Sequence, residues 1–274
     1  MIGVRLAVIL AFCLAFSGVV APAAVSTTGL RPPIVTPPPQ ELRWSEEVLA
    51  AKRNSKHIVT GDVDDEKRLA TVTDLLIPVA DAWYHGHFRF FLVDDDEDNA
   101  YVEWGPIVYV DKTLIQDSPN REELAAVICH EMSHAIRHDG YLDEVHKTTT
   151  DTSIRARIAG AFRRAEGVLH GQLRSEVDAA TKTVRGAFSA RHTRKEETMA
   201  DLTGVDLCAE AGINPWGMIW IFRRYQGGGI HVHLPTIWGD HPDFGKRIAD
   251  VKKHLIDNPE LFGGWSPKLP PTPF

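Results

Sequence analysis

The stretch ICHEMSHAIRHDG, residues 128–140, is the most informative part of the sequence, because three histidines and a glutamate follow one another closely in it. Upstream of it, Asn120 and Glu123 form a capping box, the pattern in which a polar side chain closes the first turn of a helix. We therefore predict a helix that begins after Asn120, contains the stretch and ends at Gly140.

Helical geometry gives different roles to the four metal-capable side chains of this stretch. Residues four positions apart lie about 6 Å apart along a helix and about 40° apart around it, so His130 and His134 can share one ion. Glu131 lies about 100° from His130 and can act as a general base toward a metal-bound water, the arrangement of zinc metalloproteases. His138 lies about 12 Å along the axis from His130, too far for the same ion, so we interpret it as a polar residue near the helix end.

A third ligand is best sought downstream, in the segment KEETMAD of residues 195–201. Glu197 and Asp201 lie four positions apart on a second predicted helix, so Glu197 can bind the ion while Asp201 orients a ligating histidine. Glu196 is the neighbouring alternative, but it points about 100° away and has no aspartate one turn later. Taken alone, the segment has the alternative explanation of a charged start of an ordinary helix, and the first stretch that of a solvated helix that carries histidines.

Three segments together resemble the soluble branch of the CaaX prenyl endopeptidase/HtpX-like zinc metallopeptidases, a family that includes periplasmic BepA-like proteases. They are NAYVEWGPIVYVDKTLI with EELAAVICHEMSHAIRHDG, then EETMADLTGVDLCAEAGINP, then HPDFGKRI. The resemblance extends over about residues 58–256 and implies one zinc per chain. It implies the following roles: zinc ligands His130, His134 and Glu197, general base Glu131, and Asp201 behind a ligand.

The same resemblance places His241 and Arg247 beside the zinc, where both can donate to the oxyanion that forms when a peptide carbonyl is attacked. The histidine can instead shield the zinc, and without the resemblance the segment is a loop before a final helix. The strand at residues 107–110 is expected to be the edge to which an extended substrate adds. The segment Glu103–Pro106, with a tryptophan at 104, departs from the family's usual glycine turn and leaves the shape of the cleft open.

The expected fold is α+β: a mostly helical, zincin-like metallopeptidase domain with a small β-sheet beside the active-site helix. Apolar residues at helical spacing predict a helix at residues 64–84, kinked at Pro78. Alternating and apolar runs predict strands in HFRFFLV, NAYVEW and PIVYV, residues 87–93, 99–104 and 106–110. Three further helices are predicted. One lies at about residues 148–190, one covers residues 193–212 and is closed by Gly212, and one follows a cap at Asn214, with Pro215 in its first turn.

The predicted domain organisation has four parts, which are a signal peptide at 1–24, a Pro-rich linker at 25–45, the metallopeptidase domain at 46–262 and a flexible Pro-rich tail at 263–274. The first part has a positive start, an apolar run and a small-residue exit, which is typical of export to the periplasm or the extracellular space. An uncleaved membrane anchor is the alternative. Cleavage leaves Cys129 and Cys208, which are compatible with a disulfide or with two buried thiols.

These observations predict a zinc metalloendopeptidase that hydrolyses peptide bonds in unfolded or damaged proteins. The alternative from the same family is a zinc-stabilised chaperone or assembly factor that binds polypeptide with little cleavage. The formal net charge of −7 argues against nucleic acid as a partner, and membrane association is expected only if the N-terminal segment stays uncleaved. The pairs His85/His87 and His231/His233 are interpreted as polar loop positions beside the cleft rather than as a second metal site.

Overall fold

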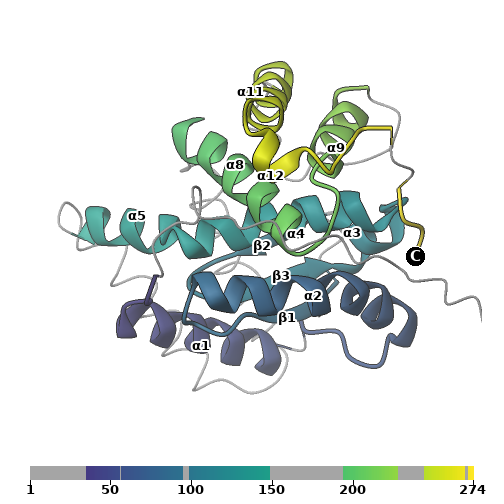
Figure 1. The fold of residues 1–274 in the computed structure, drawn as a ribbon. Helices are drawn as coiled ribbons and strands as arrows, with labels where there is room; N and C mark the ends of the chain where they lie inside the picture. Colours follow the sequence, from purple (N-terminus) through teal and green to yellow (C-terminus); the bar gives the residue numbers. More distant parts are fainter. Residues whose placement is uncertain (1–34, 56, 95–98, 149–193, 228–243, 269–270) are drawn as a thin grey trace, which may run out of the picture.

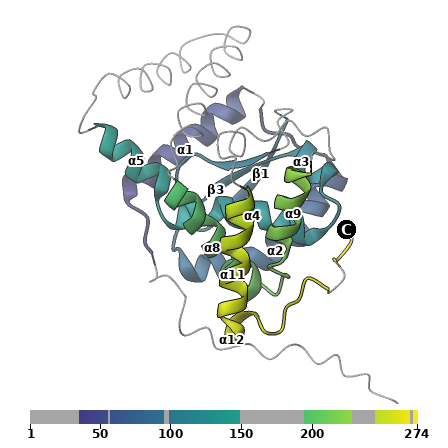
Figure 2. The ribbon, with the colours of Figure 1, turned by 90° about the horizontal axis from the view of Figure 1, so that it is seen from above.

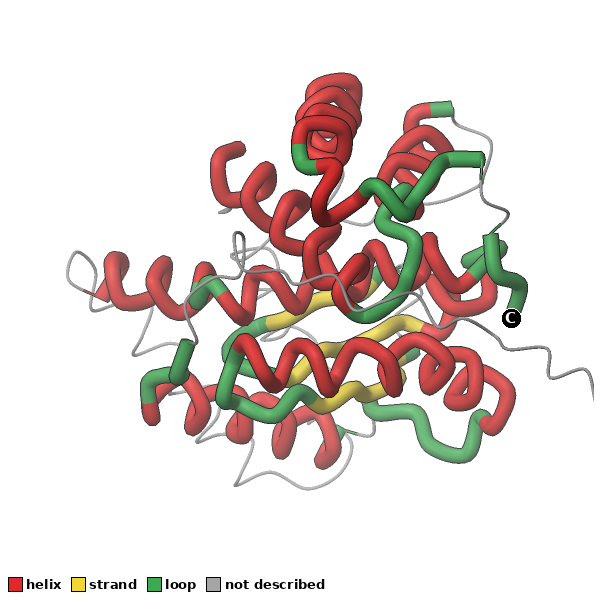
Figure 3. Tube along the Cα trace, in the orientation of Figure 1, coloured by secondary structure: helices red, strands yellow, loops and turns green. Residues whose placement is uncertain are grey.

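The computed structural model describes residues 35–55, 57–94, 99–148, 194–227, 244–268 and 271–274. This part of the chain is mostly helical with one three-stranded sheet, so the predicted α+β class is confirmed (Figure 3). The expected signal peptide, the predicted helix at 148–190 and the residues His231, His233 and His241 lie wholly or almost wholly outside the described residues. Within the described residues, no helix has both the length and the apolar composition needed to cross a membrane.

The sheet consists of β1 (Arg89–Val93), β2 (Ala100–Val102) and β3 (Ile107–Asp111), in the order β1-β3-β2. β3 pairs in parallel with β1 and antiparallel with β2. The expectation that residues 107–110 form the edge is therefore wrong, because β3 is bonded on both sides and all five of its residues are buried. β2 is the edge strand on the side of the active-site helix (Figure 1).

Among the described residues, the main core lies chiefly between one face of the sheet and five helices. These are α2 (Val63–Trp83), α4 (Arg121–Ile136), α8 (Arg194–Glu210), α9 (Gly217–Gln226) and α11 (Phe244–Asp257). Figure 2 shows α11 between α8 and α9 on the outer side of this layer. α4 is the central helix, since every residue from Glu122 to Ile136 is buried. Its predicted cap is present: the side chain of Asn120 accepts a hydrogen bond from the amide of Glu123 at 2.9 Å.

A second core lies on the other face of the sheet, under α1 (Pro39–Asn54). Val48 and Leu49 of this helix pack against the sheet residues Tyr101, Ile107 and Tyr109, which alternate in direction with the residues that face the main core. The predicted linker at 25–45 is therefore too long. The helix already begins at Pro39, because proline suits the first turn of a helix, where no amide partner is needed.

The C-terminal segment also differs from the predicted flexible tail. After α12 (Pro259–Phe262), the chain continues along the start of α4. The amide of Arg121 donates to the carbonyl of Thr272 at 2.9 Å, and the amide of Thr272 donates to the side chain of Glu122 at 2.7 Å. These bonds attach the segment to the metallopeptidase domain, since they satisfy polar groups at the first turn of α4.

Several helix boundaries are close to the predicted ones, and two differ. The helix predicted at 64–84 is confirmed as α2 and continues through Pro78. α4 ends at Ile136 rather than at Gly140, because His138 takes a left-handed conformation with φ of 58° and α5 (Asp139–Thr148) begins immediately after it. α9 begins at Gly217 rather than at Pro215, and the side chain of Asn214 accepts a hydrogen bond from the amide of Trp216 at 3.2 Å. The short helix α3 (Lys112–Asp117) joins β3 to the α4 cap.

Candidate metal centre

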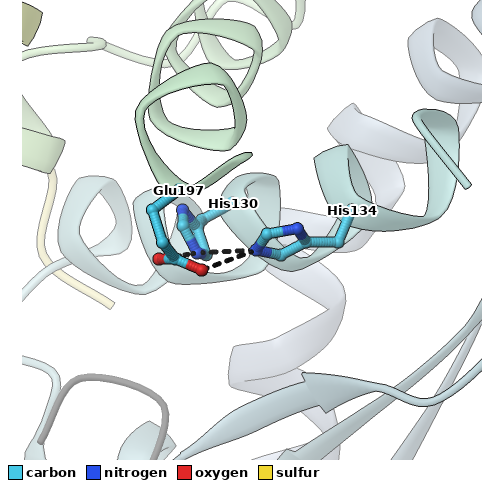
Figure 4. A group of neighbouring side chains, drawn as sticks. All are labelled: His130, His134 and Glu197. Carbon is cyan, nitrogen blue, oxygen red and sulfur yellow. Dashed lines mark hydrogen bonds and ion pairs between the residues drawn. The ribbon is translucent and has the colours of Figure 1, made fainter. Parts of the chain in front are cut away.

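Three side chains from two helices converge on one point (Figure 4). His130 and His134 come from α4, and Glu197 comes from the first turn of α8. The Nε2 atoms of the two histidines lie 3.1 Å apart. Each of these nitrogens lies 3.5 Å from a carboxylate oxygen of Glu197. All three residues are buried, so the group forms an enclosed polar site inside an apolar core.

The spacing of these atoms fits a zinc ion. With zinc–ligand distances of about 2.1 Å and tetrahedral angles, neighbouring ligand atoms are about 3.4 Å apart, close to the distances found here. The Nδ1 atoms of both histidines point at other carboxylates, so their Nε2 atoms face each other and Glu197 as electron-pair donors. Such an arrangement of donors can hold a cation between them, and two imidazoles with one carboxylate are a donor set typical of catalytic zinc.

Close packing of α8 on α4 brings Glu197 to the histidines. A Cβ atom on Gly204 would lie 3.2 Å from the backbone nitrogen of His130 and 3.3 Å from the carbonyl carbon of Cys129. A larger residue at this position would push the two helices apart. Because Glu197 and Gly204 lie two turns apart on one face of α8, the glycine lets the carboxylate reach the histidine pair.

Each histidine is oriented by a carboxylate behind it. His130 donates from Nδ1 to Asp201 at 2.9 Å, and His134 donates from Nδ1 to Asp139 at 2.8 Å. Asp201 is in turn held by two nitrogens of Arg247, at 2.7 and 2.5 Å. Such hydrogen bonds fix the tautomer and the ring orientation of a ligating histidine, which leaves Nε2 directed at the ion.

The charges of the site favour a bound cation. Burial alone would lower the pKa of His134, but the carboxylates of Asp139 and Glu197 outweigh it and raise this pKa to about 10. Burial would raise the pKa of Glu197, yet the two imidazoles hold it well below its usual range. The carboxylate of Glu197 therefore stays ionised although it is buried. It attracts positive charge, either as protons on the two imidazoles or as a metal ion.

Glu131 lies beside this group without belonging to it. Burial raises the pKa of its carboxyl group, which makes it a stronger base than an exposed glutamate, and the nearby His130 and His134 counteract part of this rise. The backbone N–H of Val102, in the edge strand β2, hydrogen-bonds to this carboxylate. Among the described residues, no group donates a hydrogen bond to its buried Oε1 atom, so this oxygen can accept a proton from water.

Sequence reasoning missed Asp139 and assigned Arg247 differently. Asp139 reaches His134 because the left-handed His138 turns the chain at the end of α4, and an unbroken helix to Gly140 would point it elsewhere. Arg247 was expected to donate to an oxyanion. In the structure it is buried, it is bonded to Asp201, and its Nη1 lies 3.6 Å from Glu197, so it stabilises the carboxylates of the site.

Other candidate residues lie away from the site. Trp104 is buried against Trp44, with ring centroids 5.3 Å apart, so it belongs to the second core. His138 pairs with Glu41. Cys129 and Cys208 are free, buried thiols, and Cys129 lies in the core as predicted. His87 is exposed at a loop position, where its Nδ1 lies 3.2 Å from Asp81.

We expect the substitution Asp201→Asn to weaken zinc binding by about 10- to 100-fold, because the neutral amide orients His130 less strongly and removes the charge that pairs with Arg247 at this position. Competition with a chromophoric chelator measures this affinity. Asp206→Asn is the matched control, since Asp206 lies on the same helix and also bonds a histidine, His254, at 2.8 Å. Equal zinc affinities for the two variants would show that Asp201 does not support the site.

Comparison with known proteins agrees with this geometry. The family model described as "Peptidase family M48" matches residues 64–255, which include all the residues of the site. A putative beta-barrel assembly-enhancing protease of Vibrio cholerae is 24% identical over 233 residues, which cover 81% of this chain and 45% of that protein. The beta-barrel assembly-enhancing protease of Escherichia coli is 26% identical over 168 residues, covering 60% of this chain and 34% of that protein. The chain thus spans less than half the length of these relatives.

Proposed function

We propose, from the premise that this chain belongs to peptidase family M48, that it is a zinc-dependent metalloendopeptidase that hydrolyses peptide bonds in unfolded polypeptides. The family supports a peptidase of the metalloprotease type. The observation that carries the finer proposal is the set His130, His134 and Glu197, whose ligand atoms all lie within 4.8 Å of one another, beside the buried carboxylate of Glu131. A zinc-stabilised chaperone needs the three ligands but gains nothing from such a base.

When bound, zinc supplies a Lewis acid that lowers the pKa of a water molecule to about 7 and polarises the peptide carbonyl. Glu131 accepts a proton from the attacking water at Oε1 and later returns it to the leaving amine. The N–H of Val102 stabilises the ionised form of this carboxylate. Asp201 and Asp139 keep His130 and His134 in their orientations throughout.

The edge strand β2 is the proposed binding element for the polypeptide. The carbonyl of Asn99 accepts a hydrogen bond from the amide of Asp111, so the backbone groups of Asn99 face β3. Because the backbone groups of successive residues point to alternate sides of a strand, the N–H of Val102, three residues later, points to the outer edge, where it meets Glu131. An extended chain that pairs with this edge lies directly beside the base. Main-chain pairing reads an extended conformation more than a sequence, which supports unfolded proteins as the substrate class.

This proposal also places the chain outside the cytoplasm, on the basis of the signal-peptide pattern at residues 1–24. The names of the longer relatives refer to the assembly of β-barrels. For this chain we propose hydrolysis of unfolded polypeptide.

The test is digestion of casein, with a disulfide-bonded protein compared in its native and its reduced, alkylated forms. We expect casein and the reduced form to be cut and the native form to resist. We also expect a chelator to stop cleavage until zinc is restored, because His130, His134 and Glu197 are the only group of possible metal ligands found among the described residues. Cleavage that continues at full rate in excess chelator would contradict a zinc mechanism. Equal cleavage of native and reduced forms would contradict the proposed substrate class.

A further inference from the structure

The helix α1 lies before the region that the family model matches, yet it contributes two buried charged side chains to the segment around β2. Glu41 and Lys52 are each 1% exposed. Charged side chains are almost never buried so completely unless they are paired, because removing them from water is costly. Their partners therefore indicate what the helix is positioned to hold.

Lys52 contacts β2 and the residue that follows it. Its ammonium group lies 3.2 Å from the carboxylate of Glu103, and it donates to the hydroxyl of Tyr101 at 3.1 Å. The same ammonium group lies over two aromatic rings, 5.0 Å from the ring centroid of Tyr101 and 4.8 Å from that of Tyr109. These contacts attach β2 and the residue that follows it to α1 and to the central strand.

Glu41 contacts both the turn that follows β2 and the residue segment that follows α4. Its Oε1 accepts a hydrogen bond from the amide of Gly105 at 3.1 Å, while its Oε2 lies 2.5 Å from Nδ1 of His138, just after α4. Gly105 has a φ of 63°, and a Cβ there would lie 3.3 Å from Oγ of Ser45, one turn along α1. One carboxylate thus spans the gap between the turn after the edge strand and the end of the helix that carries both histidines.

We propose that Glu41 and Lys52 are positioning residues through which α1 fixes the edge strand β2 relative to α4, and so determines how tightly an extended polypeptide is held beside Glu131. We call this set of contacts the α1 brace. The inference rests on the proposed function, because it assumes that polypeptide pairs with β2. β2 has only three residues and, among the described strands, pairs with β3 alone, so its position depends on what holds its ends.

The test measures polypeptide binding without cleavage. In the background of Glu131→Gln, fluorescein-labelled casein is titrated with the zinc-loaded protein, and anisotropy gives the Kd. Glu41→Ala removes both contacts of the carboxylate, and we expect the Kd to rise about tenfold, with zinc still bound at one ion per chain. Glu41→Gln keeps an acceptor for Gly105 and a polar group for His138, so we expect this conservative variant to stay within about threefold.

The matched control is Glu46→Ala. Glu46 lies on the same helix, but it is exposed and pairs with Arg89 of β1, at the far edge of the sheet. We expect its Kd to stay within about twofold, since exposed ion pairs contribute little. A Glu41→Ala protein that melts cooperatively and binds casein as tightly as Glu46→Ala would overturn the proposal. Loss of casein binding in parallel with loss of zinc would also overturn it, because the effect would then arise at the metal centre.

A second variant decides the question if Glu41→Ala does not fold. His138→Gly removes the contact from the side of α4, and glycine accepts the positive φ at this position without strain. We expect the Kd to rise by about fivefold with zinc retained, and an unchanged Kd overturns the proposal. Because binding is measured in an inactive background, wild-type protein that binds casein but never cuts it would contradict the proposed function and leave the α1 brace intact.

Discussion

The variant Glu131→Gln is expected to lose casein cleavage by about 10²- to 10⁴-fold while it still binds one zinc per chain. Glutamine has nearly the same shape as glutamate, but it cannot accept a proton from water. The ligand atoms belong to His130, His134 and Glu197, so the metal site stays intact. Burial raises the pKa of Glu131, so removing its charge is not expected to lower the thermal stability.

Initial rates of casein digestion, together with zinc content, measure this effect. Glu47→Gln is the matched control, because it makes the same change at an exposed position of α1. A Glu131→Gln protein that cuts casein at the wild-type rate would show that another group acts as the base. A variant that loses its zinc would show instead that Glu131 is a ligand, contrary to the geometry.

The second large effect is expected from His134→Ala, which removes a ligand from the middle of the group. Zinc sites held by three or four ligands are worth about 10–16 kcal/mol, so each ligand accounts for about 3–4 kcal/mol and the affinity should fall by roughly 10²- to 10³-fold. The change also removes the hydrogen bond from His134 to the buried carboxylate of Asp139, which then keeps its ion pair with Arg137 at 3.4 Å, and this loss is expected to lower the melting temperature of the zinc-loaded protein.

Chelator competition and thermal melting in the presence of zinc measure these two losses. His87→Asn is a suitable control, since the side chain of His87 is 86% exposed and asparagine tolerates its positive φ of 59°. If His134→Ala binds zinc as tightly as the control, the metal is held by other residues. If it loses zinc but not stability, the metal contributes to chemistry alone.

The features that depend on local spacing could be predicted from the sequence. His130 and His134 lie on one face of α4 because they are four residues apart on a capped helix, and the same holds for Glu197 and Asp201 on α8. The strands and the helix α2 follow from apolar periodicity. These features are determined within a few turns of chain, so no knowledge of the tertiary fold is needed.

The features that depend on tertiary packing could not be predicted in the same way. Asp139 becomes a partner of His134 only because the chain reverses at His138, whose left-handed backbone has no strong signal in the sequence. The role of Arg247 follows from the packing of α11 against α8. The uninterrupted apolar run of β3 is typical of a central strand, and it was the available signal that this strand is not the edge.

The zinc content of the purified protein, measured by elemental analysis alongside casein digestion of the same sample, tests the metal centre itself. We predict one zinc per chain in the wild type, loss of most of it in His134→Ala, and cleavage in proportion to the zinc bound. A wild-type protein that contains less than about a tenth of a zinc per chain and takes up none from added zinc would contradict a zinc-dependent peptidase.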